Sequence, residues 1–183
     1  MSNDWLIITE KAKEKLRIGE LVDTRTFDPN RSLITDKWLK LYALALRDSN
    51  PLWFDDAYAK REGRFGRRVV PTAYYTLFNP MENGGACPAS DFWAELHGKP
   101  GRYWGGHAAY NKIDAKRPLR LGDRVGYCEL RNRDCFEKRG KKNVLVCVET
   151  EYRVFTAEKE LVAVCAYGNM SQFGYPPGTE PKA

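Results

Sequence analysis

Hydrophobic residues recur at helical spacing in the first half of this chain and form long strand-like runs in the second. Residues 9–16 are typical of a short helix that Thr9 caps, with lysines toward its end. A strand is expected over residues 21–27. A longer helix follows Thr35, and its few polar positions leave the other faces apolar. We therefore expect this second helix to be largely buried.

Turn residues then divide the helical half. Pro51 must end the second helix, because the residue before a proline is pushed out of the α-conformation, so a turn precedes it. Asp55 suits the cap of a short third helix, which Gly63 ends. Pro71 favours a first helical position, and a fourth helix is expected over residues 71–78.

The next segment, residues 81–101, is rich in glycine, proline and short polar side chains. Loops of this length are uncommon inside a compact domain and tend to be functional or mobile. The segment is therefore either a lid over a binding site or an ordinary insertion.

The second half is predicted to be strand-rich. Within it, residues 144–148 are continuously apolar, as in a strand covered on both faces, whereas residues 149–154 alternate, as in a half-exposed one. With a further strand near residues 106–113, the pattern predicts an antiparallel meander. Three long strand-like runs make up its main part, at residues 124–137, 143–155 and 161–173.

Helices followed by a long antiparallel sheet form an α+β arrangement, in which the sheet must cover its apolar face. A curved sheet wrapped around a helix meets that requirement. The length of 183 residues fits a single domain. We place this domain at residues 1–173 and expect residues 174–183 to be a disordered C-terminal tail.

Composition narrows the class of protein. The longest mostly apolar run, residues 38–46, is too short to span a membrane, and the acidic, polar start lacks a basic targeting region, so we expect a cytoplasmic protein without membrane association. Five cysteines without Cys-x-x-Cys spacing argue against a disulfide framework and a zinc site. No metal is expected.

The net charge of +6 comes partly from basic clusters at residues 60–68 and 138–142. Nucleic acid would suit such charge, but no helix-turn-helix, zinc-finger or RNA-recognition signature accompanies it, so we expect none. A phosphate-bearing carrier such as coenzyme A fits with fewer assumptions, and an ordinary solvated surface is the alternative. The side chains that could meet the phosphates are Arg64, Arg67 and Arg68, or Lys141 and Lys142.

Several short motifs occur in an order that resembles the MaoC-like dehydratase family. They are Asp48-x-Asn50-Pro-Leu, the Ala-Tyr-Ala of residues 57–59, Val70-Pro71-Thr72, and residues 117–123 leading into the strands. Residues 137–152 are similar to the N-terminal, FAS1-type dehydratase domain of that family, and the whole resemblance covers residues 15–173. It implies the hot-dog fold, a long antiparallel sheet wrapped around a central helix.

The resemblance also implies an activity and its partners. Members of the family add water to, or remove it from, a 2-enoyl thioester of coenzyme A or acyl carrier protein, without a further cofactor. They pair with a homologous hot-dog subunit as a homodimer or heterodimer. Their chemistry needs a carboxylate and a histidine to handle water, and fixed N–H donors for the thioester oxygen.

One position departs from the family pattern. Asp48 matches the catalytic carboxylate and Asn50 its neighbour, but Trp53 stands where the family has histidine. An indole N–H can donate a proton but cannot accept one. The only histidines of the sequence are His97, in the long loop, and His107, at the start of a strand. His107 is the candidate substitute, and a solvated or core histidine is the alternative reading.

Substrate contacts are expected around the same segment. Pro71 at a helix start leaves the N–H groups of Thr72 and Ala73 without intrahelical partners, so they could hold the thioester oxygen or merely pack the helix end. Trp53 would fill the space of a catalytic water and shape the acyl site. The aromatic residues nearby could line an acyl tunnel or form core: Trp38, Tyr42, Tyr74, Tyr75 and Phe78.

Three functions follow from these residues. The first is the accessory or substrate-binding subunit of a heteromeric hydratase, whose partner supplies a complete Asp/His pair. The second is a self-sufficient homodimeric enoyl-CoA hydratase that uses Asp48 with another residue. The third is a hot-dog thioesterase or acyl-thioester binder, because that chemistry needs a carboxylate and backbone N–H groups but no histidine.

Overall fold

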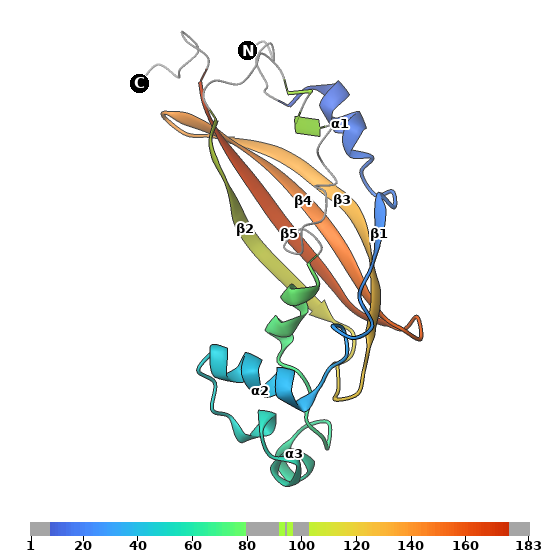
Figure 1. Ribbon diagram of the computed structural model, residues 1–183. Coiled ribbons are helices and arrows are strands. Elements are labelled where there is room, and N and C mark those ends of the chain that lie inside the picture. The colour runs from blue at the N-terminus through green and yellow to red at the C-terminus, as the bar shows by residue number, and fades with distance from the viewer. Residues whose placement is uncertain (1–7, 80–91, 94, 97–102, 176–183) are drawn as a thin grey trace.

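The computed structural model describes residues 8–79, 92–93, 95–96 and 103–175, and at residues 103–105 it describes the backbone alone. Its main feature is one antiparallel sheet, long and strongly twisted (Figure 1), in the order β1-β3-β4-β5-β2. The strands are β1 (Asp23–Thr26), β2 (Tyr103–Ala115), β3 (Val125–Arg139), β4 (Asn143–Thr156) and β5 (Leu161–Gly174).

The three long strands of the second half confirm the prediction, because the ends of β3, β4 and β5 lie within about two residues of the expected ones. The place of the preceding strand differs. β2 pairs with β5 on the far edge and not with β3, whose free side is taken by β1. The meander therefore has three strands, and the chain crosses the sheet between β2 and β3.

Short helices lie at both ends of this sheet. The hydroxyls of Thr9 and Thr35 and the carboxylate of Asp55 accept the N–H groups of Ala12, Trp38 and Tyr58, which confirms the three predicted caps. In Figure 1, α1 lies near one end of the sheet, and α2 and α3 lie at the other. The helices are α1 (Glu10–Leu16), α2 (Asp36–Ala45), the 3-10 turn η1 (Pro51–Trp53), α3 (Asp56–Glu62) and the 3-10 helix η2 (Thr72–Phe78).

One face of the sheet carries two apolar clusters. The first includes Tyr75 and Phe78 of η2 together with Tyr152 of β4. The second includes Leu16 of α1 together with Val146 of β4. Positions 146 and 152 are separated by an even number of residues, so both clusters cover the same face. Between them lies buried Asn132, whose amide donates to the Leu16 carbonyl at 2.8 Å.

The opposite face of β4 differs from the expectation. The alternation over residues 149–154 predicted exposed charges, yet Glu149 and Glu151 are both buried. Their neighbours cover them: the Tyr110 hydroxyl donates to Glu149, and the Arg153 guanidinium donates to Glu151 at 2.7 Å. Long polar side chains therefore close over this face, an effect that alternation along one strand does not reveal.

The expectation that α2 is largely buried is wrong for this chain by itself. Within the helix only Leu39 and Ala43 are buried. Leu44 is 63% exposed, and three other large apolar side chains on or beside α2 are also exposed, namely Trp38, Leu41 and Leu46. The periodicity indicated correctly that most faces of α2 are apolar. The rest of this chain, however, packs against one face of the helix alone.

Other expectations meet the structure in part. The strand β5 extends to Gly174, and Tyr175 is buried with its hydroxyl on the Gly140 carbonyl at 2.8 Å, while residues 176–183 lie outside the described part. Most of the long loop at 81–101 lies outside it too, including His97.

Four described cysteines are free thiols, and burial raises the pKa of Cys165 to about 11. Among the described residues, no helix is long and apolar enough to cross a membrane.

Candidate functional site

The segment after α2 is held by the backbone pattern of a helix end. Arg47 adopts a left-handed conformation with φ of 55°, and the Asp48 N–H donates to the Ala43 carbonyl at 2.9 Å. The side chain of Asp48 then accepts the Asn50 N–H at 3.0 Å, and that of Asn50 accepts the Leu52 N–H at 3.0 Å. Asp and Asn readily form such local turns, so both residues act here as caps.

Trp53 completes this arrangement. Its indole Nε1–H donates to the second carboxylate oxygen of Asp48 at 2.7 Å, and both side chains are half-buried. Each oxygen of Asp48 therefore already accepts one hydrogen bond from its own segment. Trp53 stands where the family pattern has histidine. Its indole donates a hydrogen bond to the Asp48 carboxylate but cannot accept a proton.

His107 lies elsewhere. It is exposed on β2 opposite Met170, and it borders a separate cavity of about 490 Å³ together with Trp93 and Tyr167. From His107 to the end of β2 at Ala115 the strand extends about 26 Å, at about 3.3 Å per residue. The helices α2 and α3 lie beyond that end (Figure 1), so the structure does not bring His107 to Asp48.

The helix predicted at Pro71 is shorter and tighter than expected. Pro71 flanks η2, a 3-10 helix of seven residues, and the Tyr74 N–H donates to the Pro71 carbonyl at 2.9 Å. Thr72 and Ala73 are exposed, and their N–H groups have no acceptor within the described part of the chain. They are available as donors, although a 3-10 helix has poorer hydrogen-bond geometry than the expected α-helix.

Of the three arginines, Arg68 is buried and already bonded. Its guanidinium donates to Asp36, to both carboxylate oxygens of Asp56 at 2.7 and 3.1 Å, and to the Trp53 carbonyl at 3.4 Å. The hydrogen bond from Lys40, followed by that from Arg68, lowers the pKa of Asp36. Arg68 thus joins α2, η1 and α3.

The other basic residues are exposed. The Arg64 guanidinium lies 5.6 Å from the centre of the Phe65 ring, and Arg67 forms no ion pair with a described residue. Lys141 and Lys142 are exposed in the turn between β3 and β4, at the end of the sheet away from α2 (Figure 1). The two basic clusters therefore lie too far apart to contact one phosphate group.

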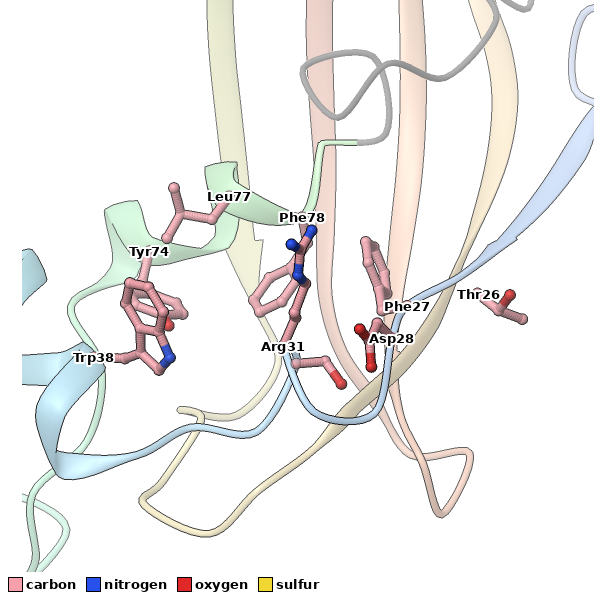
Figure 2. A pocket seen from close by; sticks show the side chains of 9 residues that line it. Thr26, Phe27, Asp28, Arg31, Trp38, Tyr74, Leu77 and Phe78 are labelled. Atoms are coloured by element: carbon pink, nitrogen blue, oxygen red, sulfur yellow. The ribbon is translucent and has the colours of Figure 1, made fainter.

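A cavity of about 540 Å³ opens beside η2, and its lining includes three of the aromatic residues that the sequence offered as either tunnel or core. Trp38, Tyr74 and Phe78 border it, whereas Tyr75 is core: its hydroxyl donates to the Arg117 carbonyl at 2.6 Å. The remaining lining comes from the end of β1, from the loop after it and from η2 (Figure 2): Thr26, Phe27, Asp28, Arg31, Ser32 and Leu77.

A protein-family model matches residues 22–164, and its description is a FAS1-like dehydratase domain region. The chain belongs to the FAS1-like dehydratase family. The match includes the Asp48 segment, η2 and most of the sheet. A search of curated protein sequences gives no match.

Solved structures support the fold of this FAS1-like dehydratase domain. The ChsH1-ChsH2 complex from Mycobacterium tuberculosis matches with a TM-score of 0.67 and 19% identity, covering 96% of each chain. The R-hydratase PhaJ1 from Pseudomonas aeruginosa matches at 0.53 and 20%, covering 90% of this chain and 91% of that one. The HadBC (3R-hydroxyacyl-ACP dehydratase) complex from Mycobacterium tuberculosis matches at 0.56 and 15%, covering 81% and 94%. These likenesses confirm the α+β hot-dog fold.

Metal chemistry has no evident site in the described ranges, where no group of three His, Cys, Asp or Glu side chains is arranged to hold an ion. The family to which this dehydratase domain belongs consists of hydro-lyases. Among the described residues, Asp48 accepts hydrogen bonds from the Asn50 N–H and the Trp53 indole, and the described histidine, His107, lies on β2 instead.

Proposed function

We propose that this chain is the accessory, substrate-binding subunit of a heteromeric enoyl-thioester hydratase or dehydratase, and that a second hot-dog chain supplies the acid–base pair. The hydrogen bond from the Trp53 indole to Asp48 carries this proposal. In related enzymes this segment holds the catalytic residues. Here its side chains form hydrogen bonds within the segment itself.

The chemistry explains why that bond matters. Hydration of a 2-enoyl thioester requires one group to take a proton from water and one to deliver a proton to the α-carbon, and such catalysis contributes about 10²–10⁴-fold in rate. Asp48 could serve as one of these groups. Trp53 cannot serve as the other, and its ring occupies the space beside the carboxylate.

Two exposed features favour a partner subunit. Leu41 and Leu44, three residues apart, give α2 an uncovered apolar side, which isolated proteins rarely keep without function. β2 is an edge strand of 13 residues, and a long edge is open to further strand pairing. Two of the structures with the same fold are described as complexes of two named components, ChsH1-ChsH2 and HadBC.

The substrate contacts remain part of the proposal. Arg64 and Arg67 are two exposed cations of the first basic cluster that could meet the phosphates of coenzyme A. The N–H groups of Thr72 and Ala73 are the donors that could meet the thioester oxygen. Arg68 holds the segment together beneath them, since its own donors are already bonded.

The test is an assay of the purified chain alone on crotonyl-CoA and longer 2-enoyl-CoA substrates. We expect no hydration above background. A turnover that disappears with Asp48→Asn would instead establish a self-sufficient hydratase. Release of free thiol from saturated acyl-CoA would establish a thioesterase.

A further inference from the structure

The face of the sheet opposite to η2 carries a charged hollow of about 320 Å³. Glu151 of β4 borders it, and because Glu151 is adjacent to Tyr152 in an extended strand, its side chain points away from the apolar cluster around η2. The hollow shares no lining residue with the Asp48 segment or with the cavity beside η2. Its other residues come from β3, β4 and the turn after α1: Ile18, Gly19, Arg131, Arg133 and Arg153.

Glu151 orients two of these arginines. Its carboxylate, which is 10% exposed, accepts the Arg153 Nε–H at 2.7 Å and lies 3.6 Å from the Arg133 Nε. The terminal amino groups of Arg133 and Arg153 form no hydrogen bond with another described residue. A guanidinium group has five N–H donors, so both arginines keep four of theirs for a ligand.

These donors are accessible from solvent. The side chains of Arg133 and Arg153 are 50% and 41% exposed. The third guanidinium, that of Arg131, is held in place, because it donates to the Gly19 carbonyl at 3.1 Å and to Glu129 at 3.4 Å. Three guanidinium groups therefore border one hollow, and two of them have terminal donors that a ligand can reach.

The charges of the lining favour a ligand with two negative charges. Three arginines and one carboxylate border the hollow, so its lining has a net charge of +2. Glu149 lies outside the lining, 3.5 Å from Arg133, and also pairs with Lys112 and accepts the Tyr110 hydroxyl. A phosphate monoester carries about two negative charges near neutral pH, and its oxygens match the planar donors of arginine.

One apolar side chain borders the same hollow. Ile18 is 47% exposed, and a side chain added at the neighbouring Gly19 would meet no atom within 4 Å. The rim therefore has open space beside an uncovered isoleucine. An ester with an organic body would cover Ile18 and bury apolar surface, a contribution that inorganic phosphate cannot make.

We propose that this hollow binds a small phosphate monoester, whose phosphate contacts Arg133 and Arg153 beside Arg131 and whose organic body lies against Ile18. The site goes beyond the proposed hydratase function, because it lies on the other face of the sheet. A ligand bound here leaves the Asp48 segment and the N–H groups of Thr72 and Ala73 uncovered.

The test is calorimetric titration of the full chain at low salt and about pH 8 with two probes of the same shape. Phenyl phosphate carries two charges at this pH, because its second pKa is about 6, and phenyl sulfate carries one. We expect phenyl phosphate to bind about tenfold more tightly, since one further charge faces the arginines. Inorganic phosphate should bind more weakly than phenyl phosphate, and Ile18→Ser should remove that difference.

Two variants test the arginines. Arg133→Gln and Arg153→Gln should each weaken phenyl phosphate about tenfold, as expected for the loss of a hydrogen bond to a charged group. Arg133 is exposed, so its variant should keep the thermal unfolding midpoint of the wild-type chain. The matched control Arg124→Gln removes the same charge from an exposed residue outside the lining, and it should leave the affinity within about twofold.

Absence of phenyl phosphate binding, equal affinities for phenyl phosphate and phenyl sulfate, or equal effects of Arg133→Gln and Arg124→Gln would overturn the proposal. Equal affinities for phenyl phosphate and inorganic phosphate would identify free phosphate as the ligand and overturn the ester. A chain saturated with coenzyme A should still bind phenyl phosphate, and competition between the two would contradict a separate site. These titrations require neither turnover nor a partner chain, so their outcome is independent of the hydration assay.

Discussion

At the scale of single residues, the exchange of histidine for tryptophan changes the function of a whole segment. Asp48 and Asn50 keep the turn, and the Trp53 indole bonds to the carboxylate that a histidine would otherwise accompany. The sequence alone predicted the lost base, because a tryptophan has no acceptor. It could not predict the new bond, since that depends on the rotamer of the indole.

This bond should be measurable as a coupling energy. Trp53→Phe keeps an aromatic ring but removes the N–H, and we expect the free energy of unfolding to fall by about 1.5–3 kcal/mol, as for a hydrogen bond to a charged group. Urea unfolding of Trp53→Phe, Asp48→Ala and the double variant gives the coupling. Strictly additive effects would show that the two side chains do not interact.

Arg68 should matter for stability, in contrast to its neighbour Arg67. Arg68→Met removes the links among α2, η1 and α3 and should lower the free energy of unfolding by about 2 kcal/mol. The matched control Arg67→Met changes an exposed side chain and should stay within about 0.5 kcal/mol. Equal effects of the two substitutions would contradict the structural role of Arg68.

The contact between Arg68 and Asp36 predicts that the cost of Arg68→Met depends on pH. Lys40 and Arg68 lower the pKa of Asp36 below its ordinary value of 3.8. A carboxyl with a lowered folded pKa stabilises the fold above its ordinary pKa, and this contribution is lost as the pH falls through the folded pKa. The cost of Arg68→Met should therefore be larger at pH 7 than at about pH 3, as measured by urea unfolding. A larger cost at acid pH would contradict it.

At the scale of elements, the sequence predicted the type and bounds of each helix and strand better than its burial and its pairing partners. The caps at Thr9, Thr35 and Asp55 and the bounds of β3–β5 follow from local patterns, and the structure confirms them. The burial of α2 and the pairing of β2 depend on distant partners, and both expectations were wrong. Periodicity measures the apolar side of a helix and says nothing of which chain covers it.

The apolar side of α2 should therefore matter for association more than for folding. Leu44→Lys changes a side chain that is 63% exposed, so the free energy of unfolding of the isolated chain should change by less than about 0.5 kcal/mol. In the heteromer, burial of one leucine contributes about 1.5–3 kcal/mol, so affinity for the partner should fall at least about tenfold. Calorimetric titration of the two chains measures this.

Lys37→Gln serves as the control, because Lys37 is an exposed polar residue of the same helix. It should leave the affinity for the partner unchanged. If Leu44→Lys binds the partner as tightly as the wild-type chain does, α2 is not part of the interface.

At the scale of the whole molecule, the α+β class and the hot-dog fold were predictable, because several motifs of one family occur in order and long strands follow the helices. The candidate site was predictable only in part. Arg64, Arg67 and Arg68 look alike in the sequence, yet only Arg68 is buried. The 540 Å³ cavity forms where three segments meet in space, so no local pattern could reveal its place.

The central claim is that the acid–base pair belongs to a second chain, and one measurement tests it most directly. This chain is combined with a hot-dog partner that has an intact Asp-x-Asn-Pro-x-His segment, and enoyl-CoA hydration by the complex is compared for two matched Asp→Asn variants. We predict that Asp48→Asn in this chain leaves the rate within about threefold, whereas the equivalent change in the partner lowers it by about 10²–10⁴-fold, the contribution of acid–base catalysis. A loss of that size with Asp48→Asn alone would contradict the account.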